Sequence, residues 1–377
     1  MKDSRNARWF LAESREREKM NALILHGIGD LRYEQQATPD PQAGEVRVRI
    51  GYCGVCGSDI PRCFVKGTYH FPTIPGHEFA GTIDALGAGV EQFSVGDPVA
   101  VFPLLWCGKC NACQRKAYAQ CSDYDYLGSR SDGGFADYVI APVRNLIAVP
   151  QGVSLRAAAM AEPAAVARHA VRRAGELKPG TSVAIFGAGP IGLMVAQWAS
   201  AAGGDVMLCD IVPEKLEQAR TLGFNHLFNS KTGNPVEWIE SLTAGEGASV
   251  CIEAAGVPVT LIQACTAVAR AGCLVLMGNP SADVTLPASL ISQLMRREVS
   301  LRGTWNSFYD PDAPSDDWRE ALAAMADGRL QAERLVTHDV PFSGGVGALE
   351  MMRDQSAFFS KVMLRPDETA SPPGICR

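Results

Sequence analysis

The chain has 377 residues, which is long enough for two or three domains of ordinary size. Its 35 Lys+Arg and 41 Asp+Glu give a net charge of −6, which argues against a protein that binds nucleic acid or an anionic membrane through a basic face. With 47% hydrophobic and 20% charged residues, the chain is not disordered as a whole. Its 12 cysteines indicate metal binding or catalysis, because a chain of this size does not need disulfide staples.

The two ends of the chain differ from the rest. Residues 1–19 are dense in charge and lack the apolar stretch of a secretory signal, and Met20 then precedes a plausible first strand at 21–25. We expect 1–19 to be a leader or a non-native extension, with a short surface helix as the alternative. The proline-rich tail 366–377 is expected to be frayed.

Residues from about 20 to 160 are rich in glycine, proline, valine and short alternating runs. Residues 45–50 alternate at period two, as in a half-buried strand, and residues 96–101 read as a turn followed by a strand. This texture predicts a β-rich domain.

From about residue 155, helical segments alternate with short apolar strands, which predicts an α/β domain with a parallel, doubly wound sheet. The expected strands are 183–186, 206–209, 250–252 and 273–277, and the expected helices are 155–175, 191–202, 213–222 and 259–269. The uncharged stretch 181–204 is interrupted by glycines and Pro190, so we interpret it as strand, turn and helix and not as a membrane span. The chain is expected to return to the first domain after Trp305, giving a catalytic domain of 20–163 and 307–365 with a nucleotide domain of 164–306 inserted in it.

A glycine loop connects the first strand of the inserted domain to its helix. Its three glycines permit a tight turn, the approach of a pyrophosphate and close packing of helix on strand. Asp210 follows at the end of the next strand, where a carboxylate accepts from ribose hydroxyls and repels a 2′-phosphate, so NAD is favoured over NADP. Lys215 can reach the same ribose. The loop consists of Gly187, Ala188, Gly189, Pro190, Ile191 and Gly192.

Four cysteines lie within fifteen positions, in the pattern C-x2-C-x2-C-x7-C. Short C-x-x-C loops suit tetrahedral zinc, and four thiolates leave no position for substrate, so the predicted site is structural. Free thiols and redox-active disulfides are the alternatives. The cysteines are Cys107, Cys110, Cys113 and Cys121.

Cys56, His77 and Glu78 form a second candidate metal site. A thiolate, an imidazole and a carboxylate can hold zinc and leave a position open, where the metal acts as a Lewis acid. Glu162 is the candidate for a further ligand, because a carboxylate among alanines needs a partner if it is buried.

Together these motifs resemble the zinc-dependent medium-chain alcohol and polyol dehydrogenases over about residues 20–365. The segment from Gly76 to Val90 matches their zinc signature, G-H-E-x2-G-x5-G-x2-V, and the four cysteines match their structural-zinc lobe. The resemblance implies a GroES-like catalytic domain, an inserted Rossmann domain, NAD and two zinc ions per chain. Glu162 stands where the alcohol dehydrogenases have cysteine, which is typical of the sorbitol-dehydrogenase branch; which of Glu78 and Glu162 contacts zinc directly stays open.

Within that branch, segments 56–62, 124–130, 132–136 and 303–306 are similar to the enzymes that oxidise galactitol 1-phosphate. The resemblance implies hydride transfer from a secondary hydroxyl of a polyol or polyol phosphate to NAD. Pro61 replaces the histidine that often relays a proton, so Ser58 is the expected relay, and Asp59 is expected to orient the zinc ligands. The phosphate candidates are Arg62, Lys66 and Arg130.

Other substrates and roles remain as alternatives: an unphosphorylated polyol such as sorbitol or xylitol, threonine, or a non-catalytic NAD-binding sensor.

The family resemblance implies a homodimer or homotetramer, with residues 301–304 as a candidate edge strand. Free thiolates imply a reducing, cytoplasmic location. Cys209, Cys251 and Cys273 lie on apolar strands and are expected in the core, whereas Cys53, Cys63, Cys265 and Cys376 have no predicted role.

Overall fold

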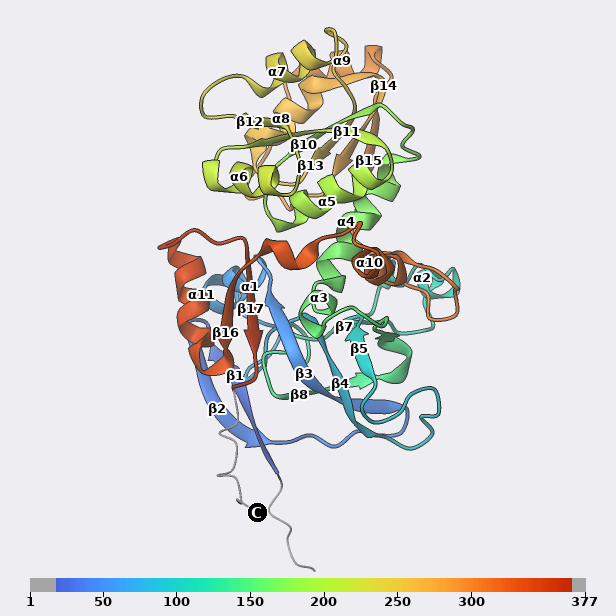
Figure 1. Cartoon of the computed structure of the whole chain (residues 1–377), viewed down its shortest axis with the longest axis vertical. Helices are drawn as coiled ribbons and strands as arrows, with labels where there is room; N and C mark the ends of the chain where they lie inside the picture. Colours follow the sequence, from blue (N-terminus) through green and yellow to red (C-terminus); the bar gives the residue numbers. More distant parts are fainter. Residues whose placement is uncertain (1–17, 368–377) are drawn as a thin grey trace, which may run out of the picture.

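The computed structural model describes residues 18–367, which form two parts connected by a long helix (Figure 1). The lower part in Figure 1 contains both ends of the described chain, and the upper part is inserted between them. The connecting helix is α4 (Ala161–Ala174), whose buried residues are mostly alanine, so its neighbours pack close to its backbone.

The lower part is built on a seven-stranded sheet in which six strands have the order β16-β17-β3-β4-β5-β9, and β8 pairs with β3. All its pairs are antiparallel except β16 with β17. A hairpin of β1 and β2 and a short pair of β6 and β7 accompany it. The strands are β1 (Lys19–Gly27), β2 (Asp30–Ala37), β3 (Glu45–Val55), β4 (Glu78–Leu86), β5 (Pro98–Val101), β6 (Leu104–Leu105), β7 (Asp125–Tyr126), β8 (Tyr138–Pro142), β9 (Leu146–Ala148), β16 (Val336–Pro341) and β17 (Lys361–Arg365).

Short helices fill the connections of this part. They are α1 (Asp59–Pro61), a π-helix at Arg62–Lys66, α2 (Asn111–Gln114), α3 (Leu155–Ala158), α10 (Asp317–Ala326), α11 (Gly345–Asp354), and 3₁₀ turns at Tyr118–Gln120, Val143–Asn145, Ala332–Leu335 and Phe342–Gly344.

The upper part is a six-stranded parallel sheet of order β12-β11-β10-β13-β14-β15, with helices on both faces. Its inner strands carry runs of consecutive buried apolar residues, such as 183–186 and 206–209, because both faces of the sheet are covered. The elements are β10 (Thr181–Phe186), α5 (Pro190–Ala201), β11 (Gly204–Asp210), α6 (Pro213–Thr221), β12 (His226–Asn229), α7 (Pro235–Leu242), β13 (Ala248–Glu253), α8 (Pro258–Ala267), β14 (Val268–Leu276), α9 (Ala288–Arg296) and β15 (Ser300–Gly303).

The predicted α/β architecture is confirmed, but two predicted helices are wrong in extent. The expected helix 155–175 is broken into α3 and α4 at residues 159–160, because the chain turns there to pass between the two parts. The expected helix 259–269 ends at Ala267, and residues 268–269 already belong to β14. In both cases a run of small apolar residues does not specify where one element stops and the next begins.

The expected boundaries at the ends of the chain need correction. Most of the expected leader 1–19 lies outside the described residues, yet Lys19 already pairs with Ala37 in the first strand. Asp367, within the expected tail 366–377, accepts hydrogen bonds from the Tyr33 hydroxyl at 2.6 Å and from the Ser343 amide at 3.2 Å. Residues 368–377 lie outside the described residues. No helix within residues 18–367 is long and apolar enough to span a membrane.

Eleven cysteines fall within residues 18–367, and none of them forms a disulfide. Cys209, Cys251 and Cys273 are buried, as predicted, and Cys53, Cys63 and Cys265, which had no predicted role, are buried as well. Cys376 lies outside the described residues.

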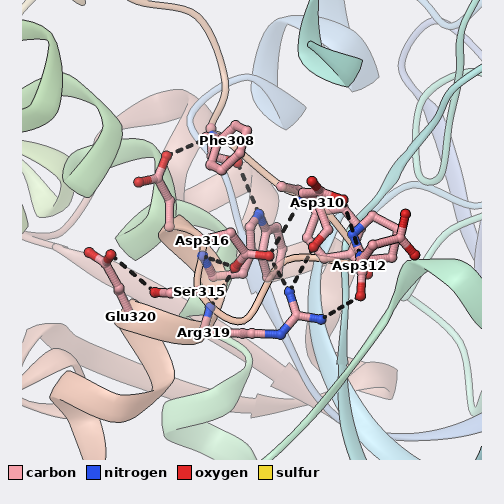
Figure 2. Close-up of polar contacts among 12 residues, drawn as sticks. Phe308, Asp310, Asp312, Ser315, Asp316, Arg319 and Glu320 are labelled. Carbon is pink, nitrogen blue, oxygen red and sulfur yellow. Dashed lines mark hydrogen bonds and ion pairs between the residues drawn. The ribbon is translucent and has the colours of Figure 1, made fainter. Parts of the chain in front are cut away.

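Polar contacts within the segment 308–320 hold the start of α10 in place (Figure 2). Asp316 caps α10 by accepting from the amides of Trp318 and Arg319, and it also pairs with the Arg319 guanidinium. Glu320 accepts from Arg168 at 2.7 Å and from Arg172 at 2.6 Å, which joins α10 to α4. This segment carries the chain from the upper part back to the lower sheet.

Candidate active site

The four-cysteine lobe brings all its sulfur atoms to one point at the surface of the lower part. The four Sγ atoms of Cys107, Cys110, Cys113 and Cys121 lie within 4.8 Å of one another, and three of the pairs are 3.5, 3.9 and 4.0 Å apart. Sulfurs placed about 2.3 Å from a tetrahedral zinc would be roughly 3.8 Å apart, so the group has the size and the donors that zinc requires.

Backbone amides make one of these thiols strongly acidic. The amides of Cys113 and Ser122 point at Cys110 and lower the pKa of its thiol to about 5. Burial instead raises the pKa of Cys113. Amides directed at sulfur stabilise thiolate, which is the form that binds metal.

The second group lies at the centre of the lower part, where β3 ends and β4 begins. Cys56 follows the last residue of β3, and His77 and Glu78 stand at the start of β4. Their ligand atoms lie within 4.8 Å of one another, and His77 and Glu78 are 5% and 1% exposed. The sequence separates these residues by about twenty positions, and the antiparallel pairing of β3 with β4 brings them together.

Asp59 supports this group from behind. Its carboxylate is fully buried, accepts from the Cys56 amide at 2.9 Å, lies 3.4 Å from His77 Nδ1 and pairs with Arg62. Burial lowers the pKa of His77, but the charge and hydrogen bonds of Asp59 and Cys56 outweigh it, so the pKa is raised well above its ordinary value. A carboxylate against one ring nitrogen leaves the other for a metal, which is the usual arrangement around a ligating histidine.

Lys361 is a site residue that the sequence analysis missed. It opens β17, is 4% exposed, and its Nζ lies 2.6 Å from Glu78 Oε2 and 3.2 Å from the Val55 carbonyl oxygen. The two side chains meet across β3 at Gly54, where a Cβ would overlap the Glu78 carboxylate. The sequence does hold one indication of this role, because Lys361 precedes the apolar residues V-M-L of a strand. A lysine buried in such a strand needs an acidic partner.

Glu162 stands beside the Cys56–His77–Glu78 group but is not a member of it. It lies in the first turn of α4, is 8% exposed, and accepts from the Tyr126 hydroxyl at 3.3 Å. Burial raises its pKa to about 7, despite the opposing effect of His77. Tyr126, also missed as a functional residue, meets the His77 ring edge-on at 5.8 Å.

A cavity of about 380 Å³ opens onto this group between the two parts of the molecule. Ser58, His77, Tyr126 and Glu162 line it from the lower part and α4, whereas Met277, Thr304 and Trp305 line it from the upper part. Of the three phosphate candidates, Arg62 and Arg130 line the cavity and Lys66 does not. Trp305 and Thr304 also border a second cavity of about 260 Å³, which reaches Glu253 and Gly256 in the upper part.

The glycine loop lies at the carboxyl end of β10, where the helix α5 begins. A Cβ at Gly192 would overlap the Gly187 carbonyl oxygen, whereas Gly189 faces open space in which a ligand can approach the backbone. Asp210 ends β11 and accepts from the amides of Ala188, Ile211 and Val212 at 2.7 to 2.9 Å. Lys215 Nζ lies 4.0 Å from the Asp210 carboxylate.

Family models match both parts of the chain. Residues 42–151 match the alcohol dehydrogenase GroES-like domain, and residues 190–327 match the zinc-binding dehydrogenase domain. The chain therefore belongs to the zinc-dependent medium-chain alcohol and polyol dehydrogenases and is an oxidoreductase.

Individual relatives cover almost the whole chain. It is 34% identical to galactitol 1-phosphate 5-dehydrogenase of Escherichia coli K12, over 92% of this chain and all of that protein. The crystal structure of galactitol-1-phosphate dehydrogenase from Escherichia coli superimposes with a TM-score of 0.86 at the same identity and coverage. Sorbitol dehydrogenase of Bacillus subtilis is 32% identical over 93% of this chain and 98% of its own. A structure of an Escherichia coli CFT073 alcohol dehydrogenase in complex with NADH is 29% identical, with a TM-score of 0.82 and coverage of 92% and 99%.

Proposed function

We propose that the protein oxidises a secondary hydroxyl of a polyol with NAD, and that its substrate is galactitol 1-phosphate or a similar hexitol phosphate, which becomes a ketose phosphate. The observation that carries this is the Cys56–His77–Glu78 group, whose His77 lies on the wall of a cavity shared by both parts of the molecule. Similarity to galactitol 1-phosphate 5-dehydrogenase over the whole of that enzyme supports the choice of substrate.

Cys56, His77 and Glu78 are the residues proposed to hold the catalytic zinc, because they supply sulfur, nitrogen and oxygen donors close together. Glu162 is proposed to complete the site from the cavity side, through solvent or substrate, since it stands outside that group. A bound zinc would supply Lewis acidity that lowers the pKa of an alcohol hydroxyl, and NAD would supply the hydride acceptor.

Three side chains of the cavity are proposed to act on the substrate. Ser58 lines the cavity beside the group and can accept the hydroxyl proton and pass it toward solvent. Glu162 and Tyr126 form a hydrogen-bonded pair that orients the substrate next to His77. Pro61, at the usual relay position, has no side-chain proton to transfer.

NAD is proposed to bind along the residues 187–192, with its ribose against Asp210 and Lys215. Three amides already donate to the Asp210 carboxylate, which leaves room for a ribose hydroxyl and none for a 2′-phosphate. Asp210→Ser should therefore weaken the preference for NAD over NADP by roughly tenfold or more, about the value of one charged hydrogen bond. The ratio of kcat/KM for the two cofactors measures this, and an unchanged ratio would reject the assignment.

The remaining features of the proposal concern the assembly of the protein. The four-cysteine lobe is proposed to hold a second, structural zinc, which makes two per chain. The domains are proposed to be 20–163 with 307–365, and 164–306.

β15 is an exposed edge of the upper sheet and is proposed to pair with its copy in a homodimer or homotetramer. The eleven cysteines within residues 18–367 form no disulfide, which is consistent with the reducing, cytoplasmic location that we propose.

The deciding experiment is a substrate panel followed by NADH absorbance, together with zinc analysis. Galactitol 1-phosphate should give the highest kcat/KM among free and 1-phosphorylated hexitols, with two zinc ions per chain. A preference for sorbitol, xylitol or threonine would select the corresponding alternative, and NAD binding without NADH formation on any substrate would indicate a sensor.

A further inference from the structure

Arg130 occupies an unusual place on the cavity wall. Its guanidinium lies between two aromatic rings, 4.2 Å from the centre of Tyr69 and 4.3 Å from the centre of Tyr124. Cation–π contacts with the two rings hold the planar group in place. All three residues line the 380 Å³ cavity that contains His77.

Most of the hydrogen-bonding capacity of this guanidinium is unused. Nη1 donates to the Tyr124 carbonyl oxygen at 3.2 Å and Nη2 donates to the Tyr69 hydroxyl at 3.2 Å, which accounts for two of the five N–H groups of an arginine. Among residues 18–367, no carboxylate forms an ion pair with Arg130. Arg62, the other arginine of the cavity, is paired with the buried Asp59. Arg130 thus contributes a positive charge that the protein itself does not neutralise.

The backbone holds Arg130 at a fixed position relative to the candidate metal site. It belongs to the tight turn 126–131, in which the amides of residues 129–131 all donate to the Tyr126 carbonyl oxygen. Gly128 of this turn packs directly on Gly76, which precedes His77, and a Cβ at Gly128 would overlap the Gly76 carbonyl oxygen. His70 Nε2 lies 2.9 Å from the Arg130 carbonyl oxygen, so the loop that carries Tyr69 is attached to the same turn.

A line of aromatic rings connects the two ends of the cavity. Tyr124 stacks on Arg130, lies 6.3 Å from Tyr126 in an edge-to-face contact, and Tyr126 in turn meets the ring of His77. A substrate lying along this wall would have one end at the metal ligands and the other at a cation.

We propose that Arg130, clamped between Tyr69 and Tyr124, is a specificity-determining site that binds the anionic end group, phosphate or carboxylate, of the substrate whose hydroxyl reacts beside His77. This inference rests on the proposed dehydrogenase function and deepens it, because it explains which feature of a polyol the cavity selects. A guanidinium with three unused N–H groups can donate to the paired oxygens of either anion.

The first test compares three substrates on wild type and Arg130→Gln: galactitol 1-phosphate, L-galactonate and galactitol. The variant should raise KM by roughly 10- to 100-fold for the preferred anionic substrate, the size of a lost charge-assisted bidentate contact, and should change kcat/KM for galactitol less than about threefold. The wild-type preference between the first two substrates distinguishes phosphate from carboxylate. Equal losses on galactitol and on both anions, or no loss on any, would overturn the proposal.

Arg144→Gln is the matched control. Arg144 also stacks on an aromatic ring, 4.3 Å from the centre of Trp106, and also donates to a carbonyl oxygen, but it lies outside the cavity. It should keep the substrate preference of the wild type. Tyr69→Leu tests the clamp without disturbing the core, because Tyr69 is 70% exposed, and it should raise KM for the anionic substrate by roughly 3- to 10-fold.

A binding measurement separates this proposal from the proposed function. Trp305 borders the same cavity, so its fluorescence can follow titration with inorganic phosphate in the absence of turnover. Arg130→Gln should raise the Kd for phosphate at least about tenfold relative to wild type and Arg144→Gln. If wild type oxidises no polyol but this difference is found, the dehydrogenase proposal fails and the anion site stands. Equal Kd values in the three proteins would overturn the anion site, whatever the activity.

Discussion

The two cysteine-containing groups of this molecule are organised in opposite ways. The four-cysteine lobe takes all its donors from residues 107–121, lies near the surface, and uses nearby amides to favour thiolate. In the Cys56–His77–Glu78 group, His77 and Glu78 are buried and Cys56 is half-buried, and the neighbours Glu162 and Lys361 come from α4 and β17, far along the chain. The first site is thus a property of a short segment, whereas the second depends on the fold of the whole lower part.

This difference has a chemical counterpart. Four thiols surrounding one point leave no vacancy, which suits a structural metal. The central group offers three donors, and its His77 lines a cavity. Charged side chains surround the group: Asp59 lies against His77, Lys361 pairs with Glu78, and Glu162 lines the same cavity. The candidate catalytic site is therefore built from distant elements, and each of them contributes a different charged neighbour to the metal-binding group.

The largest effect is expected from Cys56→Ser, which should separate the two sites by function. Activity should fall by at least roughly 10³-fold, because Lewis-acid stabilisation is worth several kcal/mol, and zinc per chain should fall from two to one. Metal analysis and NADH formation measure both. Cys63→Ala is the control, since Cys63 is a buried cysteine outside both groups and should keep two zinc ions. An active Cys56→Ser protein with no metal at the central group would reject the scheme.

Lys361→Met should show how far the central group depends on a distant strand. The change leaves the Glu78 carboxylate buried without its partner, so the free energy of unfolding should fall by about 3–5 kcal/mol. Urea denaturation measures the loss. Adding Glu78→Gln to Lys361→Met should restore much of that stability without restoring activity. A Lys361→Met protein as stable as wild type would show that the ion pair between Lys361 and Glu78 does not stabilise the fold.

Cys110→Ser should affect stability more than chemistry. Loss of one zinc ion should lower the free energy of unfolding by about 2–3 kcal/mol, while kcat of the folded protein should stay within about threefold, because distant sites act independently. Thermal unfolding and zinc content provide the measurements. A loss of activity as complete as in Cys56→Ser, in protein that remains folded, would contradict the structural role.

The smallest effect is expected from Glu320→Gln, which loosens α10 from α4 away from both groups. Burial alone would raise the pKa of Glu320, but Arg168 and Arg172 outweigh it and lower the pKa. A lowered carboxyl pKa stabilises the fold above the unfolded value of 4.5, and this contribution is lost as pH falls below it. The variant should lose about 0.5–1 kcal/mol at pH 7 and less at pH 3, by urea denaturation at both pH values. An equal loss at pH 3 would exclude the ion pairs as its cause.

Local patterns carried most of what could be predicted. The spacing of the four cysteines and the glycine loop between β10 and α5 are short-range features, and the structure shows the expected grouping and the expected strand, turn and helix. Alternating strands and helices predicted the parallel sheet, because each helix must cross over to return the chain. The break between α3 and α4 was missed, since it follows from where the two parts meet.

The sequence by itself determined the fold class, the two candidate metal groups and the family, because those depend on residue types at short and regular spacing. Only the tertiary structure decided that Lys361 neutralises Glu78, that Glu162 faces the cavity from outside the metal group, and that Arg130 stands between two tyrosines. These contacts are created by sheet register and by the packing of one tight turn on another, and neither the spacing nor the type of these residues forms a local pattern from which such contacts can be read.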